Sequence, residues 1–393
     1  WNTAAKSLQE LIPEFNKQYP DITVNIVEIP YNDANNKFRQ AIANGTGFPD
    51  VWDSEGPVTE EYARAGALLD ITAWATPYKE QFVPYKLTEV TIDNKIYALP
   101  WDSAPVAVFY RRDLFEAAGV DVESITTWDD YIAAGKKITK DTNGDGKPDQ
   151  YMAMISPKAD VQDTFEIFLA QMGGSLFSPT GEIAFNSPEG IQAVNLMKKI
   201  VDSGIAADIG WWTPEFFNSF KTGHVASYMQ GVWLGGQIKE NAPGTDGKWG
   251  VFPLPAVTAG GLRSAVNGGS NLAIPAKAKN PDAAWKFIEF ALTKKESQLQ
   301  MYKNYNIFPA LTTAYTDPVF NEPNVFFGNQ NTSELFINIQ KEIPTTWYYG
   351  QYYNDVTTII SRNIVNALNG TQTSAQALAT AEKEVNEFIV GNR

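Results

Sequence analysis

The sequence predicts an α/β fold with two lobes that the chain enters more than once. Helical and strand patterns alternate along the whole chain, which favours strands joined by helices in a parallel sheet. The 393 residues exceed one average domain of about 150 residues. No linker rich in Pro, Gly or Ser divides the chain into two continuous halves. We therefore expect each lobe to be assembled from separate segments of the chain.

Apolar periodicity places the elements in order. Leu8, Leu11 and Phe15 share one helical face, and Pro20 ends that helix. Ile22 then begins an alternation of apolar and polar residues that is typical of a strand. The same two patterns predict helices over 4–19, 38–43, 62–68, 114–119, 128–139, 191–203, 215–221, 283–292, 297–304, 356–368 and 375–390, and strands over 22–29, 50–52, 95–99, 107–110 and 225–229, with a strand pair in 264–274.

The composition excludes several classes of function. The chain has no cysteine, which excludes disulfides, thiolate metal sites and cysteine nucleophiles. Its one histidine, His224, follows a predicted helix end, where we expect a structural role rather than a catalytic one. The formal net charge of −14 opposes general binding of nucleic acid. No stretch of about 18 apolar residues predicts a membrane span. We expect any export signal to lie upstream of Trp1.

Acidic residues follow two predicted strands. Asp53, Ser54 and Glu55 come after a short buried strand, and Trp101 and Asp102 follow another. Carboxylates accept several hydrogen bonds each and suit a ligand rich in hydroxyl groups, and an indole beside them offers a stacking face. We therefore expect ligand contacts from these five residues, with Trp101 as the stacking face. A solvated loop at a strand end explains the first group equally simply. A packed indole with a capping carboxylate is the corresponding alternative for the second.

Aromatic residues make up 13% of the chain and cluster outside helical spacing. We expect Trp211, beside Trp212, and Trp233 to contact a ligand. The run from Trp347 to Tyr353 places five aromatic residues within seven positions, more than one helix face can bury. Within that run we expect ligand contacts from Trp347, Tyr348, Tyr349 and Gln351.

The loop 141–149 resembles part of a calcium-binding loop. Asp141, Asn143, Asp145 and Asp149 provide oxygen atoms at positions one, three, five and nine, and a glycine occupies position six. Position twelve is Met152, where such loops need a carboxylate. A turn without metal is therefore the alternative to a structural calcium site. No other cofactor is expected.

A set of short motifs follows in a fixed order along the chain: Tyr19-Pro20-Asp21-Ile22, Pro49-Asp50-Val51, Tyr62-Ala63-Arg64-Ala65-Gly66, Ile96-Tyr97-Ala98-Leu99-Pro100-Trp101-Asp102, Tyr110-Arg111-Arg112-Asp113-Leu114-Phe115, Phe220-Lys221-Thr222-Gly223-His224-Val225-Ala226, Gly231-Val232-Trp233 and Asn280-Pro281-Asp282-Ala283-Ala284-Trp285-Lys286-Phe287. Their order resembles the sugar-binding class of extracytoplasmic solute-binding proteins that serve ABC importers, a family typified by maltodextrin-binding proteins. The similarity extends over essentially the whole chain.

The resemblance implies a periplasmic-binding-protein-like fold, with a ligand cleft between the lobes and three hinge crossings. The first lobe would hold residues 1–110 and 264–310, and the second residues 111–263 and 311–393. The resemblance also adds Trp1, Asn2, Asp163, Asn267, Gly269 and Ser270 to the expected ligand contacts, and it supports a stacking role for Trp233.

The function implied is capture of a neutral oligosaccharide and its delivery to the transmembrane subunits of an ABC importer. β-1,4-linked xylo-, manno- or cello-oligosaccharides are the first expectation, and maltodextrins are the second. The protein would be a monomer outside the cytoplasm, in the periplasm or as a lipoprotein at the cell surface, and not an enzyme. A carbohydrate-active hydrolase and a carbohydrate-binding adhesion protein remain the alternatives.

Overall fold

The computed structural model describes residues 2–159 and 161–391, with the side chains of residues 2, 31 and 32 excluded. The chain forms two compact units. Unit 1 extends to Ser103 and includes Gly268–Asp317, whereas unit 2 contains Ala104–Asn267 and the chain from Pro318 onward. Each unit buries its own hydrophobic core. The molecule is therefore an α/β protein of two units, each with segments from separate parts of the chain.

The chain passes between the units after residues 103, 267 and 317. The sequence placed these crossings after 110, 263 and 310. The first boundary differs because the strand that begins at Val106 pairs with two strands of unit 2. That strand cannot belong to the first lobe, where the sequence analysis put it.

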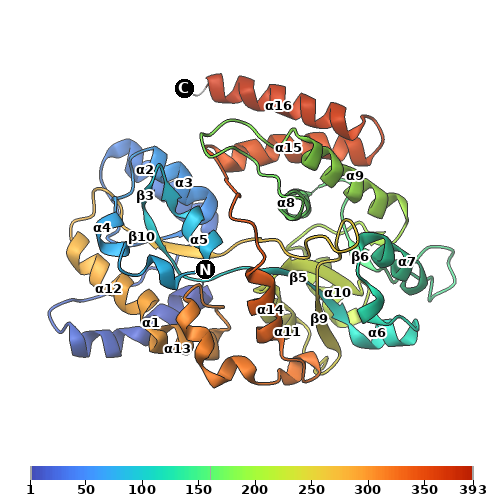
Figure 1. Cartoon of the computed structure of the whole chain (residues 1–393), viewed down its shortest axis with the longest axis horizontal. Coiled ribbons are helices and arrows are strands. Elements are labelled where there is room, and N and C mark those ends of the chain that lie inside the picture. The colour runs from blue at the N-terminus through green and yellow to red at the C-terminus, as the bar shows by residue number, and fades with distance from the viewer. Residues whose placement is uncertain (1, 160, 392–393) are drawn as a thin grey trace. The chain divides into compact units, whose positions relative to one another are not determined.

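Unit 1 surrounds a small sheet with helices (Figure 1). Its elements are α1 (Asn2–Gln18), α2 (Tyr31–Asn44), β1 (Trp52–Glu55), α3 (Gly56–Arg64), α4 (Thr72–Ala75), η1 (Lys79–Gln81), α5 (Pro84–Glu89), β2 (Thr91–Ile92), β3 (Lys95–Ile96), β4 (Ala98–Pro100), β10 (Ser270–Ala273), α12 (Pro281–Thr293), α13 (Lys295–Tyr305) and η3 (Thr312–Thr316).

In the sheet of unit 1, β10 lies between β1 and β4 and runs antiparallel to both. Two strands that oppose the same neighbour run in one direction, so β1 and β4 are parallel to each other. The alternation of helices and strands therefore predicted their direction correctly. It was wrong about adjacency, because a strand from much later in the chain inserts between them.

The strand predicted over 22–29 is absent from the assigned elements. Ile22, Val24 and Ile26 nevertheless pack against the core of unit 1 from one side of the extended chain. The alternation correctly identified the buried side chains, but the segment has no assigned ladder partner in the part of the chain that the structure describes. Of the strand pair predicted within 264–274, only β10 is an assigned strand, because residues before Gly268 form a single antiparallel bridge, Val266 with Pro105, rather than a ladder.

Unit 2 is larger, with a second three-stranded sheet and more helices (Figure 1). Its elements are β5 (Val106–Arg111), α6 (Arg112–Ala117), η2 (Val122–Ser124), α7 (Trp128–Ile138), β6 (Ala153–Met154), α8 (Gln162–Gln171), α9 (Pro188–Asp202), β7 (Ala206–Ala207), α10 (Pro214–Thr222), β8 (Ser227–Gly231), α11 (Leu234–Asn241), β9 (Trp249–Pro253), η4 (Pro318–Asn321), η5 (Val325–Phe327), α14 (Thr332–Gln340), α15 (Tyr353–Leu368) and α16 (Ser374–Gly391).

The central strand of unit 2 is β5, which runs antiparallel to β8 on one side and to β9 on the other. All six residues of β5 are buried. Side-chain caps define the starts of the surrounding helices, as at Thr127 before α7 and Thr213 before α10. Within the described ranges, no helix combines the length and apolar character needed to cross a lipid bilayer.

Candidate functional site

The sheet of unit 1 brings several predicted residues to one end. Ser54 and Glu55 of β1 lie opposite Asn271 and Ser270 of β10. Asp102 follows β4 and accepts a hydrogen bond from the Ser270 backbone N–H over 2.6 Å. Asp53, Ser54, Glu55, Asp102, Gly269 and Ser270, predicted from separate motifs, thus belong to neighbouring strand ends. We call these six residues the strand-end cluster.

A buried lysine that the sequence analysis missed lies beside this cluster. Lys86 on α5 has a side chain with no exposed surface, and its Nζ lies 2.6 Å from the Glu89 carboxylate. Asn271 donates to the same carboxylate over 2.9 Å and to the Ser54 carbonyl over 3.1 Å. A buried charge needs a paired partner. Lys86 and Glu89 therefore form the internal support of the cluster.

The cluster changes the acidity of its carboxyl groups. Desolvation raises the pKa of Asp102 to about 6, although the positive charge of Lys86 and the Ser270 N–H oppose the shift. Asp53 is more exposed. Carboxyl groups held in this way can exchange hydrogen bonds with hydroxyl groups close to neutral pH.

Gly269 allows the chain to approach this support closely. Its φ is +97°, a backbone conformation that side-chain-bearing residues rarely adopt. A Cβ atom there would lie 3.0 Å from both Lys86 Nζ and the Asp102 carbonyl oxygen. The predicted role of Gly269 is therefore best understood as a backbone role.

Trp101 lies elsewhere than the sequence analysis expected. Its side chain is fully buried in the core of unit 1, and its Nε1–H points to the Met301 sulfur at 3.2 Å. An indole whose faces are packed and whose N–H has a partner has no surface left for a ligand. The structure thus contradicts the predicted stacking contact and supports the alternative of a packed indole. Trp1 lies outside the described residues, and Asn2 begins α1 with its side chain outside the description.

In unit 2, an indole and an amide occupy the end of β8. Trp233 is half-buried, and its Nε1–H donates to the Asn267 carbonyl over 3.0 Å. Gln230, fully buried on β8, donates to the Asp163 carboxylate over 3.2 Å. Three predicted residues, Asp163, Trp233 and Asn267, are thereby held near the same strand end. Gln230 was missed because nothing distinguishes a lone Gln in a strand pattern.

A buried carboxyl group ties the late aromatic segment to α8. Both oxygen atoms of Glu166 accept from the Tyr353 hydroxyl group, over 2.8 and 3.0 Å. Gln162 donates to the same hydroxyl group over 2.8 Å. Burial, followed by the charge of Asp163, raises the pKa of Glu166 to about 8. The carboxyl group of Glu166 is therefore predominantly protonated at neutral pH.

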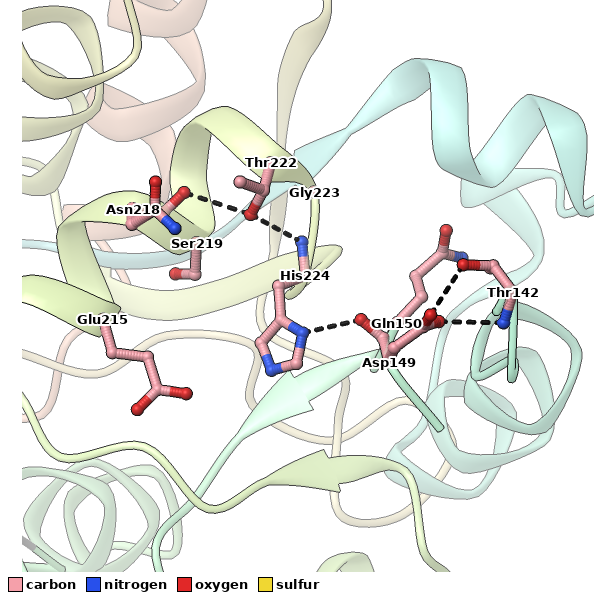
Figure 2. A pocket seen from close by; sticks show the side chains of 9 residues that line it. All are labelled: Thr142, Asp149, Gln150, Glu215, Asn218, Ser219, Thr222, Gly223 and His224. Atoms are coloured by element: carbon pink, nitrogen blue, oxygen red, sulfur yellow. Dashed lines mark hydrogen bonds between the residues drawn. The ribbon is translucent and has the colours of Figure 1, made fainter. Parts of the chain in front are cut away.

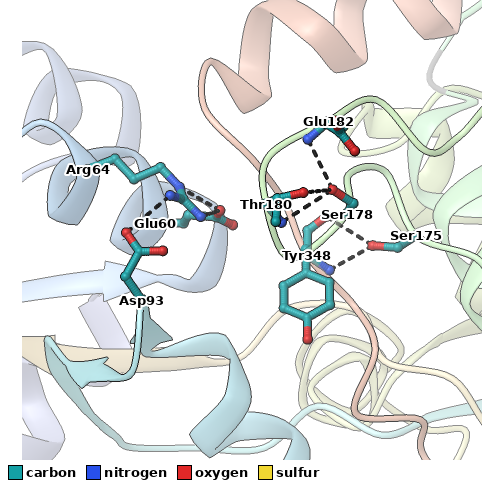
Figure 3. Close-up of polar contacts among 8 residues, drawn as sticks. All are labelled: Glu60, Arg64, Asp93, Ser175, Ser178, Thr180, Glu182 and Tyr348. Carbon is teal, nitrogen blue, oxygen red and sulfur yellow. Dashed lines mark hydrogen bonds and ion pairs between the residues drawn. The ribbon is translucent and has the colours of Figure 1, made fainter.

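The aromatic residues predicted to bind ligand directly precede Tyr353 in the chain, and two of them pack in sequence, the first against its ring and the second against the first. Tyr349 is buried with its ring 5.4 Å from that of Tyr353, and Trp347 is half-buried with its ring 5.8 Å from that of Tyr349. Tyr348 is held through its backbone, because its N–H donates to Ser175 Oγ over 2.7 Å (Figure 3). Gln351 is exposed in the turn before α15. We call residues 347–353 the aromatic segment.

Figure 3 also shows an ion-pair group of unit 1, separate from the strand-end cluster. Arg64 on α3 lies 2.9 Å from the Glu60 carboxylate and 3.5 Å from that of Asp93. Glu60 is buried, whereas the side chain of Asp93 is 73% exposed. An arrangement of this kind stabilises α3 locally and leaves the acidic residues of β1 outside it.

The loop predicted to bind calcium uses its oxygen atoms internally. Asp141 accepts from the N–H groups of Gly144 and Gly146, and Asn143 accepts from that of Asp145. Asp145 and Asp149 accept from Lys147 and Thr142. Within the described residues, no group of three or more acidic or histidine side chains is arranged to hold a metal ion. The calcium prediction is therefore not supported, and the turn reading fits.

Asp149 also borders a polar pocket of unit 2 with a volume of about 370 Å³ (Figure 2). His224 lines this pocket, and its Nδ1 lies 2.6 Å from the Asp149 carbonyl oxygen. A carbonyl only accepts, so Nδ1 carries a proton. The pocket is distinct from the strand-end cluster and from the aromatic segment.

Comparison with known proteins agrees with this architecture. Across 391 residues, the chain is 26% identical to an arabinooligosaccharide-binding protein of Halalkalibacterium halodurans, with 96% of this chain and 85% of that protein covered. A protein of the same description from Bacillus subtilis is 27% identical, with coverages of 96% and 88%. The solved ABC transporter-associated binding protein from B. animalis subsp. lactis, in complex with β-1,6-galactobiose, is 27% identical, with a TM-score of 0.81 and coverages of 98% and 95%.

The model of the bacterial extracellular solute-binding protein family matches residues 1–298, and the chain belongs to that family. It is a binding protein rather than an enzyme, and proteins of this family need no cofactor. The hydrolase alternative raised by the acidic and aromatic motifs is thereby set aside.

Proposed function

We propose that the protein captures a neutral oligosaccharide outside the cytoplasm and delivers it to the membrane subunits of an ABC importer. The strand-end cluster would accept hydrogen bonds from sugar hydroxyl groups, and aromatic residues of unit 2 would stack on the apolar faces of sugar rings. The relatives described as arabinooligosaccharide-binding and the galactobiose complex support this class of ligand.

The observation that carries the proposal is the end of β8. There the Trp233 indole is fixed by the hydrogen bond that its N–H donates to Asn267. The buried amide of Gln230, earlier in the same segment, donates a hydrogen bond to the Asp163 carboxylate. A sugar ring needs an aromatic surface for its C–H groups and polar acceptors for its rim, and this strand end holds an indole in a fixed orientation together with such acceptors. Each hydroxyl group removed from water must find a partner, so the pattern of acceptors selects the ligand.

The preference for β-1,4-linked xylo-, manno- or cello-oligosaccharides, with maltodextrins second, is part of this proposal. The relatives add arabino-oligosaccharides and β-1,6-galactobiose to the candidates. Aromatic residues in more than one segment of unit 2 favour a chain of two or more sugars over a monosaccharide. A lipid anchor at the cell surface also stays a prediction.

Isothermal titration of the whole chain against these oligosaccharides, each with its monosaccharide as a control, tests the proposal. We expect saturable binding of at least one oligosaccharide and much weaker binding of its monosaccharide. Chromatography of the recovered ligand should show it intact. Absence of binding across the panel would contradict the proposed function, and binding of a β-1,6- or α-1,4-linked ligand alone would contradict the β-1,4 preference.

A further inference from the structure

Two adjacent tryptophans before α10 have different environments. Trp211 is half-buried, and its ring packs on Phe216 with centroids 5.0 Å apart. Trp212 is 54% exposed, and among the tryptophans that the structure describes it is the only exposed one. The sequence predicted a ligand contact at Trp211. The exposure of the two rings favours Trp212 instead.

The backbone of Trp212 is also unusual. Its φ is +63°, in the left-handed region that favours glycine and asparagine. Four of the six other-than-glycine residues described with positive φ are Asp or Asn, and the remaining two are Trp212 and Tyr352. Tyr352 is half-buried and packs on Phe388, with centroids 5.6 Å apart. Trp212 therefore combines an unfavourable backbone conformation with an exposed ring. Neither feature stabilises the folded state, so the stability of the fold does not explain the combination.

The ring of Trp212 is held in place by its neighbours. It stacks on Trp233 with centroids 5.6 Å apart and an angle of 20° between the planes. Phe216 and Phe217 contact it at 5.9 and 6.2 Å. Trp233 is itself fixed by the hydrogen bond to Asn267. One face of the Trp212 ring is thus packed against Trp233, whose own orientation is fixed by a hydrogen bond, while the rest of the Trp212 ring is exposed to solvent.

A second pair of stacked indoles, Trp74 and Trp285, provides a comparison in which burial in the core explains the stacking. Trp74 and Trp285 in unit 1 lie 5.6 Å apart at 26°, nearly the same geometry. There Trp285 is buried, Trp74 is half-buried and lies within α4, and neither has positive φ. Burial accounts for that pair. It does not account for the exposed and strained Trp212, so a ligand is the better explanation.

We propose that Trp212 supplies the open stacking face for a sugar ring of the bound oligosaccharide and that Trp233 is the buttress that supports it. This inference rests on the proposed function, because it names a specificity-determining residue for the same ligand class. It moves the direct stacking contact from Trp211 and Trp233, which the sequence predicted, to Trp212, and it gives Trp233 a supporting role. It also predicts that a ligand ring covers the indole most accessible to solvent.

Titration of two variants tests the inference. Trp212→Asn removes the ring, and asparagine tolerates the left-handed backbone, so folding should be preserved. We expect its dissociation constant for the tightest oligosaccharide of the panel to rise about tenfold or more. Trp212→Phe keeps a smaller ring and should lose less. Trp74→Ala, which removes an indole from the matched pair in unit 1, should bind as the wild type does.

Fluorescence quenching by iodide gives a second readout. We expect Trp212→Phe to lower the fraction of tryptophan emission accessible to iodide. A saturating oligosaccharide should protect that fraction in the wild type and have little effect in Trp212→Phe. If the wild type binds sugar while Trp212→Asn binds within twofold of it, or while Trp212→Phe shows the same protection, the inference is wrong and the proposed function stands. If the wild type binds no saccharide, the proposed function fails and the inference fails with it.

Discussion

The strand-end cluster of unit 1 and the aromatic residues of unit 2 solve different physical problems. The first gathers carboxyl groups around a fully buried lysine, so charge is balanced internally by Lys86 and Glu89. The second holds flat rings in place with hydrogen bonds: Asn267 accepts one from Trp233, and Glu166 and Gln162 hold the Tyr353 hydroxyl group. Unit 1 therefore depends on electrostatic pairing, whereas unit 2 depends on the orientation of rings. Substitutions should separate the two dependences.

The largest effect should come from Lys86→Met. The variant leaves the Glu89 carboxylate buried without its cation, which typically destabilises a protein by about 3–5 kcal/mol. Lys17→Met is the matched control, because Lys17 and Glu14 form a pair of the same spacing in unit 1 but with 70% and 59% exposed side chains. Calorimetric unfolding should show a large fall in the melting temperature for Lys86→Met and almost none for Lys17→Met. Similar values for both variants would contradict the assignment of Lys86 as an internal support.

The next effect concerns pH and the link between Glu166 and Tyr353. Because the pKa of Glu166 is raised from 4.5 to about 8, protonation stabilises the folded state. That contribution is fully present below about pH 4.5 and is lost as the pH rises towards 8. Glu166→Gln stays neutral and should therefore gain stability relative to the wild type between pH 5 and pH 8. The gain should be on the order of a few kcal/mol, since one pKa unit corresponds to about 1.4 kcal/mol.

Glu384→Gln is the control of opposite sign. Hydrogen bonds from Arg362 and then Asn363 lower the pKa of Glu384. Its contribution is present above the ordinary pKa of a glutamate and is lost as the pH falls. The stability gap between this variant and the wild type should close in acid, whereas the gap for Glu166→Gln should widen with rising pH. Parallel pH profiles for the two variants would contradict this account.

Oligosaccharide binding should respond more strongly to substitution of an aromatic residue of unit 2 than to substitution of an acidic residue of unit 1. Trp233→Ala removes the buttress and should weaken oligosaccharide binding by about 1–3 kcal/mol, at least tenfold for most of that range. Titration calorimetry at pH 7 measures the change, with Trp74→Ala as the control. An unchanged dissociation constant would remove Trp233 from the site.

A smaller effect on binding should come from Asp102→Asn. The substitution keeps the shape and one acceptor oxygen for the Ser270 N–H but removes the negative charge. If a sugar hydroxyl group donates to Asp102, its loss should weaken binding by about 1.5 kcal/mol, roughly tenfold. Ser270 is held through its backbone, so Ser270→Ala should change affinity less. The reverse order would move the hydrogen-bonding role from the carboxylate to the serine.

The sequence located most of the longer helices, but it missed α8, α11 and α14 and the short helices α4 and α5. The reason is clearest for α8. Eight consecutive residues of that helix, Thr164–Gln171, are buried. A helix buried on all sides has no polar face, so the periodicity on which the prediction depends is absent. The direction of β1 and β4 was predictable from the helices between them. The insertion of β10 was not, because no local pattern reports a pairing between residues more than 200 positions apart.

For the site, the acidic strand ends were predictable because carboxylates after buried strands stand out in the sequence. Lys86 was not, since a lysine on a short helix is normally exposed and only tertiary packing reveals its burial. Trp101 was wrongly assigned for the opposite reason: an indole beside a carboxylate reads the same in sequence whether its face is open or packed. The choice between Trp211 and Trp212 likewise required the backbone angles and the exposure of each ring.

The position of β10 in the sheet of unit 1 has a consequence for how the protein is made. The three strands of the unit 2 sheet are complete once residue 253 has been synthesised, whereas the middle strand of the unit 1 sheet spans Ser270–Ala273. During vectorial synthesis, β1 and β4 emerge early but cannot form their sheet until β10, the strand that pairs with both, has also emerged. Unit 1, whose first strand precedes every strand of unit 2 in the chain, therefore completes its sheet after unit 2 does.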